Sequence, residues 1–233
     1  MSFTYRLCKR IFDIVCSVLG LLVASPIFIV AVIGILISDP GPILYVADRV
    51  GYKNRHFKMY KFRSMRVDKE ANENNFKADT NRIFSFGAFM RDTKIDELPQ
   101  LINLLKGDMS IVGPRPASSD QVGVVRKGKY AACSSVKPGL TSPSALYDYI
   151  YGDTVEDEKE YEDKVLPTRL ELDLYYVNNA NMLLDIKTIF DTALCIIKQI
   201  LKISLDKKKE SLISLVNSPS KKQIPSVTYI GEK

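Results

Sequence analysis

An apolar run from residue 11 to residue 37 limits what this chain can fold into more than any other feature of the sequence. About 20 apolar residues suffice to cross a bilayer, and the only charged residue in the run is Asp13. A cleavable secretory signal is a poor interpretation, because the apolar sequence continues well past the small residues at 23–25. The run therefore predicts a membrane segment.

Ser25 and Pro26 lie at the centre of this run. Proline removes one backbone hydrogen bond and disfavours the helical conformation of the residue before it. A serine hydroxyl can bond the freed carbonyl, and this tends to bend the helix. We expect a break at this pair between two half-helices of about 12 residues, each too short to span a bilayer.

Basic residues flank the run on both sides. Arg6, Lys9 and Arg10 precede it, and seven further Lys or Arg residues follow it between positions 49 and 66. Positive charge marks the cytoplasmic side of a membrane protein, so this pattern favours a re-entrant segment with both ends in the cytoplasm. On these residues alone, one kinked spanning helix remains the alternative.

The composition narrows the class of protein. With 233 residues, 46% of them hydrophobic, the chain can form one domain with a core in addition to the membrane segment. Its net charge of +6 suits an anionic partner. The four cysteines have no spacing typical of disulfides or metal sites, which predicts reduced thiols. A single histidine, His56, argues against a Ser-His-Asp mechanism and a His-rich metal site.

Periodicity predicts a small α/β domain, with a short sheet surrounded by helices of which several lie along the membrane. Alternating residues 56–65 predict a strand, and the helical pattern over 98–106 ends at Gly107. Two further helices are expected at 167–179 and 182–202. The second is amphipathic, and its apolar stripe suits either packing on the core or contact with a membrane surface.

The chain divides into three parts. We expect a re-entrant membrane hairpin at 1–40, a folded domain at 41–204 and a basic, disordered tail at 205–233. Within the domain, polar residues 67–82 predict a surface loop or short helix, and acidic residues 153–164 predict a solvated helix or loop.

Asp96 and Glu97 are adjacent acids directly before the helix that ends at Gly107. Pro99 is tolerated only in the first turn of such a helix. One interpretation is structural, with Asp96 as the helix cap. In the other, the acids are chemical groups, and the helix dipole depresses the pKa of Asp96 and keeps it ionised.

Several cations support the chemical interpretation. Arg91 lies one helical turn before the acids, Arg115 is held between two prolines, and Lys61 and Arg63 alternate onto one face of a strand. Guanidinium groups bind phosphate oxygens, and a carboxylate can hold Mg²⁺ against them. The remaining carboxylate could attack phosphorus and form an acyl phosphate. The sequence thus predicts a site for Mg²⁺ and a diphosphate, although a basic surface near anionic lipid would explain some of these cations.

Six segments, in order, resemble the bacterial sugar transferase family, the monotopic phosphoglycosyl transferases. The resemblance runs from about residue 5 to about residue 200. The segments are "KRIFDIVCSVLGLLVASPIF", "SDPGPILYVADRVG", "FKMYKFRSM", "RDTKIDELPQLINLLKGDMSIVGPRP", "VKPGLT" and "LELDLYYV".

The resemblance implies an enzyme that starts polysaccharide or glycoprotein glycan assembly. Such an enzyme moves sugar 1-phosphate from a nucleotide-activated sugar, usually a UDP-sugar, to a polyprenyl phosphate, usually undecaprenyl phosphate, and releases the nucleoside monophosphate. By this resemblance Asp96 is the nucleophile that forms a phosphosugar intermediate, and Glu97 is the Mg²⁺ ligand. The phosphate-binding cluster contains Lys61, Arg91 and Arg115, and Asp173 matches a further position that the family needs.

The resemblance also implies a location. Family members have a re-entrant helix broken at the Ser-Pro pair and sit on the cytoplasmic face of the bacterial inner membrane. This chain is similar to the small form, which lacks the N-terminal membrane domain of the large forms. The expected partners are the UDP-sugar donor, the polyprenyl phosphate acceptor and membrane lipid. Whether the protein forms a homodimer is left undecided, and no nucleic-acid partner is expected.

The chain departs from the common family pattern at "GLTSPSAL" and at residues 149–169, so the sugar is left open. Two alternative functions also stay open. A non-catalytic scaffold for glycan-assembly enzymes would tolerate Asp96→Asn. An ordinary glycosyl transferase would release nucleoside diphosphate.

Overall fold

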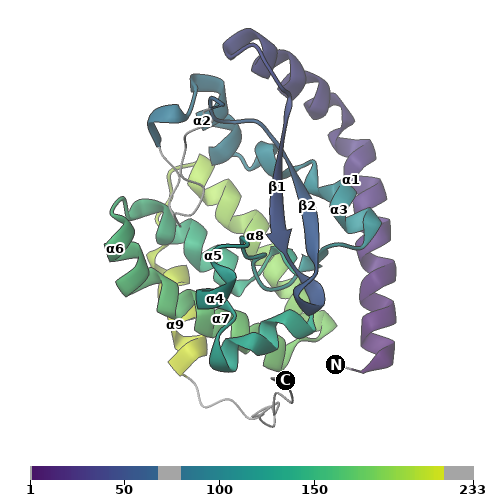
Figure 1. The fold of residues 1–233 in the computed structure, drawn as a ribbon, viewed down its shortest axis with the longest axis vertical. Coiled ribbons are helices and arrows are strands. Elements are labelled where there is room, and N and C mark those ends of the chain that lie inside the picture. The colour runs from purple at the N-terminus through teal and green to yellow at the C-terminus, as the bar shows by residue number, and fades with distance from the viewer. Residues whose placement is uncertain (1, 68–79, 218–233) are drawn as a thin grey trace, which may run out of the picture.

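The computed structural model describes residues 2–67 and 80–217, which form helices around two small sheets (Figure 1). The helices are α1 (Phe3–Ser38), α2 (Ser85–Asp92), α3 (Gln100–Lys106), α4 (Val122–Val125), α5 (Pro143–Ile150), α6 (Glu158–Glu160), α7 (Leu166–Asn179), α8 (Met182–Ile200) and α9 (Asp206–Asn217). The strands are β1 (Leu44–Val50), β2 (His56–Phe62), β3 (Ser110–Val112) and β4 (Gly139–Thr141). Shorter helical turns are η1 (Tyr52–Asn54), η2 (Thr80–Arg82), η3 (Ile95–Glu97), η4 (Gly128–Ser135), η5 (Gly152–Thr154) and the π-helical η6 (Tyr161–Val165).

The expectation of a short sheet among helices holds, although helix predominates. Strands β1 and β2 form an antiparallel hairpin in which Leu44 lies opposite Phe62. Strands β3 and β4 form a separate parallel pair. Strand β2 begins where the sequence predicts but ends at Phe62, three residues before the predicted end at residue 65. The helices predicted at 167–179 and 182–202 are confirmed as α7 and α8.

Helix α1 continues through Pro26 as one helix of 36 residues, and it bends over the top of the fold (Figure 1). Proline cannot donate to the carbonyl of Leu22, and the Ser25 hydroxyl donates to that carbonyl at 2.8 Å instead. The predicted back-bonding by Ser25 is therefore confirmed. The predicted break into two half-helices is not, because the serine replaces the hydrogen bond that the proline removes.

Most apolar side chains of α1 lie at the surface. The helix is long and apolar enough to cross a membrane, and only 17% of its most apolar stretch is buried by the rest of the protein. The exceptions are in its C-terminal half, where Ala31 and Ile35 pack against Phe62 of β2, Met90 of α2 and Phe84, the residue before α2. A helix of a soluble core buries its apolar stripe, so the exposed apolar surface of α1 indicates association with a membrane.

Polar contacts hold the N-terminal half of α1 against the folded domain. The ammonium of Lys9 lies 2.7 Å from the carboxylate of Asp185 at the start of α8. Arg10 donates to two backbone carbonyls at the end of α3, at 2.6 and 2.8 Å, where helix carbonyls lack partners of their own. Asp13 accepts a backbone N–H from β3 at 2.9 Å. This half of α1 is therefore part of the domain surface.

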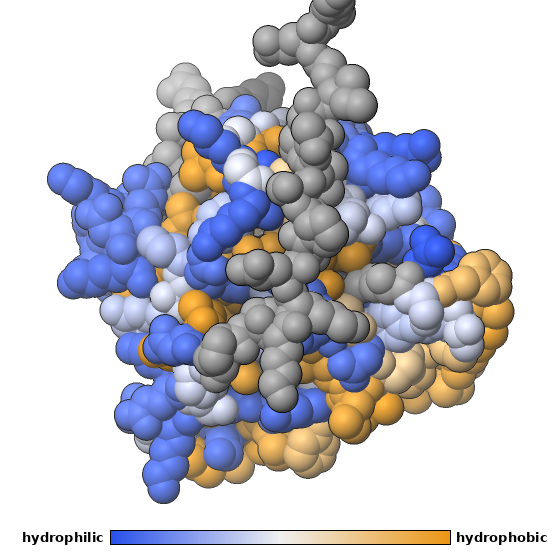
Figure 2. Space-filling view, turned by 90° about the horizontal axis from the view of Figure 1, so that it is seen from below, coloured by the Kyte–Doolittle hydropathy of each residue, from blue (hydrophilic) through white to orange (hydrophobic). Residues whose placement is uncertain are grey.

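The apolar stripe predicted on α8 faces outward. The side chains of Ile186, Phe190 and Leu201 are 52%, 63% and 63% exposed, whereas the face that packs on the domain carries Asp185 and Cys195. Figure 2 shows apolar residues gathered along the side of the molecule on which α1 lies, with hydrophilic residues over much of the rest of this view. Of the two expectations for this stripe, packing on the core is wrong.

The C-terminal tail is more ordered than we expected. Residues 206–217 form α9, because Leu212 is buried against the core of α5 and α7 and Lys208 pairs with Asp191 at 2.5 Å. The remainder of the predicted tail, 218–233, lies outside the described residues. So does most of the predicted surface loop at 67–82, of which only the ends are described.

Candidate active site

The two adjacent acids lie in the turn η3, just before α3. The N-cap of α3 is Pro99, and no side chain caps this helix, so the interpretation of Asp96 as a helix cap is wrong. The chain enters the turn through Lys94, whose φ of 58° lies in the left-handed region. A non-glycine residue in this conformation is strained, and such strain is concentrated at functional sites.

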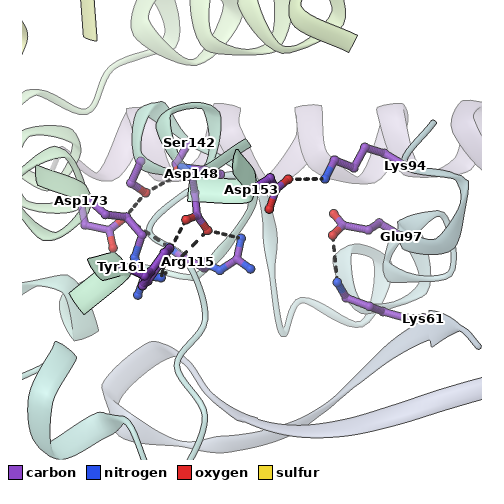
Figure 3. A network of polar contacts seen from close by, with 12 residues as sticks. Lys61, Lys94, Glu97, Arg115, Ser142, Asp148, Asp153, Tyr161 and Asp173 are labelled. Carbon is purple, nitrogen blue, oxygen red and sulfur yellow. Dashed lines mark hydrogen bonds and ion pairs between the residues drawn. The ribbon is translucent and has the colours of Figure 1, made fainter. Parts of the chain in front are cut away.

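Glu97 forms an ion pair with Lys61 of β2, with Oε1 and Nζ 2.8 Å apart (Figure 3). Burial would raise the pKa of Glu97, but the charges of Lys61, Lys94 and Arg115 and the hydrogen bond from Lys61 together outweigh it and lower the pKa to about 2. The predicted neighbours Lys61 and Glu97 thus come together, from a strand and a turn that are 36 residues apart.

Asp96 is buried, with 4% of its surface exposed. Burial raises its pKa to about 6, the positive charge of Lys61 opposes this rise, and the adjacent Glu97 adds to it. The expectation of a depressed pKa is wrong, because α3 begins after Pro99 and its dipole does not reach a carboxyl that has lost its water. Among the described residues, no hydrogen-bond donor lies within reach of the buried Oδ1 of Asp96.

Arg115 lies in the loop after β3, and this loop is fixed from two sides. The backbone N–H of Arg115 donates to Asp173 of α7 at 3.3 Å, and Ser144 donates to the same buried carboxylate at 2.5 Å. The carbonyl of Arg115 accepts a hydrogen bond from Arg126 at 2.7 Å. The family resemblance groups Asp173 with the phosphate-binding residues, and in the structure its carboxylate fixes the backbone of the loop that carries Arg115.

The side chain of Arg115 remains 47% exposed and lies 3.3 Å from the carboxylate of Asp148. Figure 3 shows Lys61 and Glu97 on one side of the site and Arg115 with Asp148 on the other. Between them is a cavity of about 130 Å³. Its charged lining residues are five cations and two carboxylates: Arg49, Lys61, Arg115, Arg126, Arg169, Glu97 and Asp173.

This excess of positive charge suits a diphosphate, because guanidinium and ammonium groups bind phosphate oxygens strongly. We did not predict Arg49, Arg126 or Arg169 from the sequence. Arg169 had a usable signal, since it precedes Asp173 by four residues and so lies on the same face of α7. No pattern in the sequence points to Arg49 or Arg126, because only the fold brings β1 and the end of α4 to this cavity.

Two predicted cations lie outside the cavity lining. The guanidinium of Arg63 bonds the carboxylate and carbonyl of Asp39 and the carbonyl of Pro42, so it fixes the exit of α1. It does not share a strand face with Lys61, because β2 ends at Phe62. Arg91 lies beside Met65, with 3.9 Å between guanidinium and sulfur, and its charge opposes the rise in the pKa of Asp96 that burial causes.

The acids fit a magnesium site of a particular type. Within residues 2–67 and 80–217, no group of three or more Asp, Glu, His or Cys side chains could hold a metal ion. Mg²⁺ in phosphate-transfer sites uses one or two carboxylates and takes its other ligands from water and substrate phosphates. Asp96, with a buried oxygen that lacks a donor, and Glu97 beside a cationic cavity fit that requirement.

Three relatives carry names that describe transfer to undecaprenyl phosphate. The chain is 38% identical over 201 residues to the UDP-glucose:undecaprenyl-phosphate glucose-1-phosphate transferase of Escherichia coli (strain K12), covering 82% of this chain and 40% of that protein. It is 36% identical over 216 residues to the undecaprenyl-phosphate galactose phosphotransferase of Salmonella typhimurium (strain LT2), covering 83% and 41%. It is 33% identical over 191 residues to the UDP-N-acetylgalactosamine-undecaprenyl-phosphate N-acetylgalactosaminephosphotransferase of Aeromonas hydrophila, covering 81% and 43%.

The chain therefore spans about two fifths of the length of these relatives. Their names carry three different sugars, so likeness to them does not select one. The model of the bacterial sugar transferase family matches residues 4–199, which include α1, the cavity and α8. This chain belongs to the bacterial sugar transferase family.

Proposed function

We propose that this chain transfers sugar 1-phosphate from a UDP-sugar to undecaprenyl phosphate and releases UMP, as the first step of glycan assembly. The observation that carries the proposal is the cationic cavity beside the acids of η3 in a chain of this family. Relatives named as sugar-1-phosphate transferases acting on undecaprenyl phosphate support the donor and acceptor classes.

The reaction takes place in two displacements at one phosphorus atom. A carboxylate oxygen of Asp96 attacks the β-phosphorus of the donor, and the bond from that phosphorus to the bridging oxygen breaks. UMP leaves with the electron pair, and an acyl phosphate joins the sugar phosphate to Asp96. A phosphate oxygen of the lipid then attacks the same phosphorus, releasing Asp96 as a carboxylate and giving the lipid diphosphate sugar.

The residues around the cavity bind and orient the diphosphate. Arg115 and Lys61 hold the phosphate oxygens, and Arg49, Arg126 and Arg169 add to the positive field that offsets charge developing on the leaving UMP. Glu97, with Asp96 beside it, would hold Mg²⁺, which supplies Lewis-acid stabilisation of the phosphates when bound. Because Asp96 is buried, its carboxylate has few bound water molecules to lose before it attacks phosphorus.

Product analysis tests this reaction. The purified chain, in detergent or nanodiscs with Mg²⁺ and undecaprenyl phosphate, is given a panel of UDP-sugars, and the released nucleotide is identified by chromatography. We expect UMP with at least one donor. Release of UDP would mean simple glycosyl transfer, and no release with any donor, combined with unimpaired glycan assembly by Asp96→Asn in cells, would favour a scaffold.

The pH dependence of the enzymatic activity should follow the ionisation of Asp96. A protonated carboxyl cannot attack phosphorus, and the pKa of Asp96 is raised to about 6, so activity is lost as pH falls. We expect kcat/KM for the donor to be level above this pKa and to fall about tenfold per pH unit below it. Glu97, with a pKa of about 2, stays ionised throughout. Donor saturation curves from about pH 4.5 to about pH 8 test this, and a flat profile would contradict it.

We further propose that α1 enters and leaves the bilayer on one side, the cytoplasmic face of the inner membrane. A straight helix of 36 residues would be about 54 Å long, far more than the hydrocarbon core of about 30 Å. Lys9, Arg10 and Asp13 contact the folded domain, and residue 39 leads directly into it. Both ends of α1 therefore belong on the side of the domain, and the bend of α1 over the top of the fold supports a dip into one leaflet (Figure 1).

Thiol labelling distinguishes re-entry from spanning. Cys8 is free and exposed near the start of α1, and Lys127→Cys places a second exposed thiol on the folded domain. With Cys16 replaced by Ser, an impermeant maleimide is added to intact or permeabilised spheroplasts. We expect Cys8 and the thiol at position 127 to label under the same condition, after permeabilisation. Labelling on opposite sides of the membrane would establish a spanning helix.

A re-entrant α1 and the outward apolar face of α8 would hold the cavity at the membrane interface. The polar phosphate of the acceptor lies in that layer while its prenyl chain stays in the hydrocarbon, so the second displacement needs no extraction of the lipid. The exposed side chains of Ile186 and Phe190 would insert into the same layer.

A further inference from the structure

We propose that Asp148 is a positioning residue that holds Arg115 in the orientation needed to bind the donor diphosphate. This inference rests on the proposed function, in which Arg115 binds that diphosphate. It assigns a role to a residue of α5 that lies between the two stretches in which this chain departs from the common family pattern.

The geometry around Asp148 is that of a fixed anion between cations. Asp148 is 7% exposed, and one of its oxygens lies 3.3 Å from a guanidinium nitrogen of Arg115 and 4.0 Å from one of Arg169. A buried carboxylate that lost both partners would be strongly destabilised. The pairing therefore restricts the half-exposed Arg115 side chain, which the proline-flanked backbone alone does not do.

Tyr161 fixes the other oxygen of Asp148. Its hydroxyl donates to that oxygen at 2.6 Å, and it accepts a hydrogen bond from Arg169 at 2.6 Å (Figure 3). Tyr161 opens the π-helical turn η6, and such turns occur as local insertions often found at functional sites. Both oxygens of Asp148 are thus occupied, so the carboxylate cannot rotate away from Arg115.

Gly152 provides the space for this arrangement. A Cβ atom at Gly152 would lie 2.2 Å from Oδ1 of Asp148, the oxygen that accepts from Tyr161. Any other residue there would displace the carboxylate. Asp148, Gly152 and Tyr161 all come from the part of the chain between 143 and 165, and Gly152 and Tyr161 both act on the carboxylate that contacts Arg115.

The principal test is Asp148→Asn, which keeps the side-chain size but removes the charge that attracts Arg115. Donor kcat and KM are measured by UMP release with the full chain in nanodiscs. We expect kcat/KM to fall about 10- to 100-fold, the effect expected when a binding group is displaced by about 1 Å. Tyr161→Phe removes only the hydroxyl and should lower kcat/KM by about three- to ten-fold. It serves as the second variant if Asp148→Asn fails to fold by thermal melting.

A double-mutant cycle separates positioning from general stabilisation. If Asp148 acts through Arg115, adding Asp148→Asn to Arg115→Lys should change kcat/KM by less than about two-fold. If its role is only structural, the two effects multiply, and the proposal is overturned. The control is Asp163→Asn, an exposed carboxylate of the same segment, which should stay within about two-fold of the wild type.

A titration with inorganic pyrophosphate and Mg²⁺, followed by thermal shift, does not depend on turnover. The proposal requires a midpoint concentration about ten-fold higher for Asp148→Asn than for the wild type, and equal midpoints overturn it. Wild-type protein that binds pyrophosphate but releases no UMP would contradict the proposed function. The comparison of pyrophosphate midpoints between the wild type and Asp148→Asn would stay valid. Wild-type protein that shows neither response overturns both proposals.

Discussion

Replacing Asp96 with Asn should abolish release of UMP from the donor, with a loss of about 10⁴-fold or more in kcat, as is usual when a nucleophile is removed. Asparagine has the same shape as aspartate, so the buried turn η3 keeps its packing. An amide, however, cannot form the acyl phosphate on which both displacements depend. Because Asp96 makes the covalent bond itself in the proposed mechanism, no neighbouring group should substitute for it.

Two measurements check this expectation. The first is UMP release under donor saturation. The second is the intact mass after incubation with donor and Mg²⁺ but without lipid, where the wild type should gain one sugar phosphoryl group and the variant should gain none. Asp92→Asn changes an exposed acid four residues upstream and serves as the matched control. A variant at position 96 that still forms the adduct would locate the nucleophile elsewhere.

Replacing Arg115 with Lys should lower kcat/KM for the donor by about 10²- to 10³-fold, by comparison with arginines that stabilise phosphoryl transfer elsewhere. Lysine keeps the charge, but it lacks the planar pair of donors that binds two phosphate oxygens at once. It also cannot contact Asp148 and a phosphate in the way that the guanidinium can.

The measurement is donor kcat and KM by UMP release, with Arg55→Lys as the control. Arg55 is an exposed arginine in the loop between β1 and β2 and does not line the cavity, and its replacement should leave kcat/KM within about two-fold of wild type. If Arg115→Lys retained most of the wild-type activity, a point charge would suffice at this position, and the bidentate role would be wrong.

Local sequence rules predicted some of this structure well. The bond from Ser25 to the freed carbonyl of Leu22 follows from the chemistry of a Ser-Pro pair and is present. The left-handed Gly107 ends α3 as the periodicity indicated. In each case the interacting groups lie within four residues of each other, so the contact depends on local geometry alone.

Other expectations failed where a local rule was extended past its limit. Alternation placed Arg63 beside Lys61, but it applies only inside a strand, and β2 ends one residue before Arg63. Helical periodicity placed Asp96 at a helix terminus, yet the pKa of Asp96 is set by burial among distant elements. The pairing of Asp148 with Arg115 joins residues from α5 and the loop after β3, and no spacing in the sequence predicts it.

The packing of α1 has a consequence for how this protein matures. Ala31 and Ile35 complete a core whose other members, Phe62, Phe84 and Met90, are synthesised later. The N-terminal segment is therefore synthesised before the residues that bury Ala31 and Ile35, and under the proposed insertion it would enter the bilayer before this core can form. A shortened chain without residues 1–40 would lack one wall of that core, and we would expect it to aggregate rather than yield a water-soluble enzyme. If α1 inserts into the membrane as proposed, that insertion is coupled to the folding of the domain through this shared core.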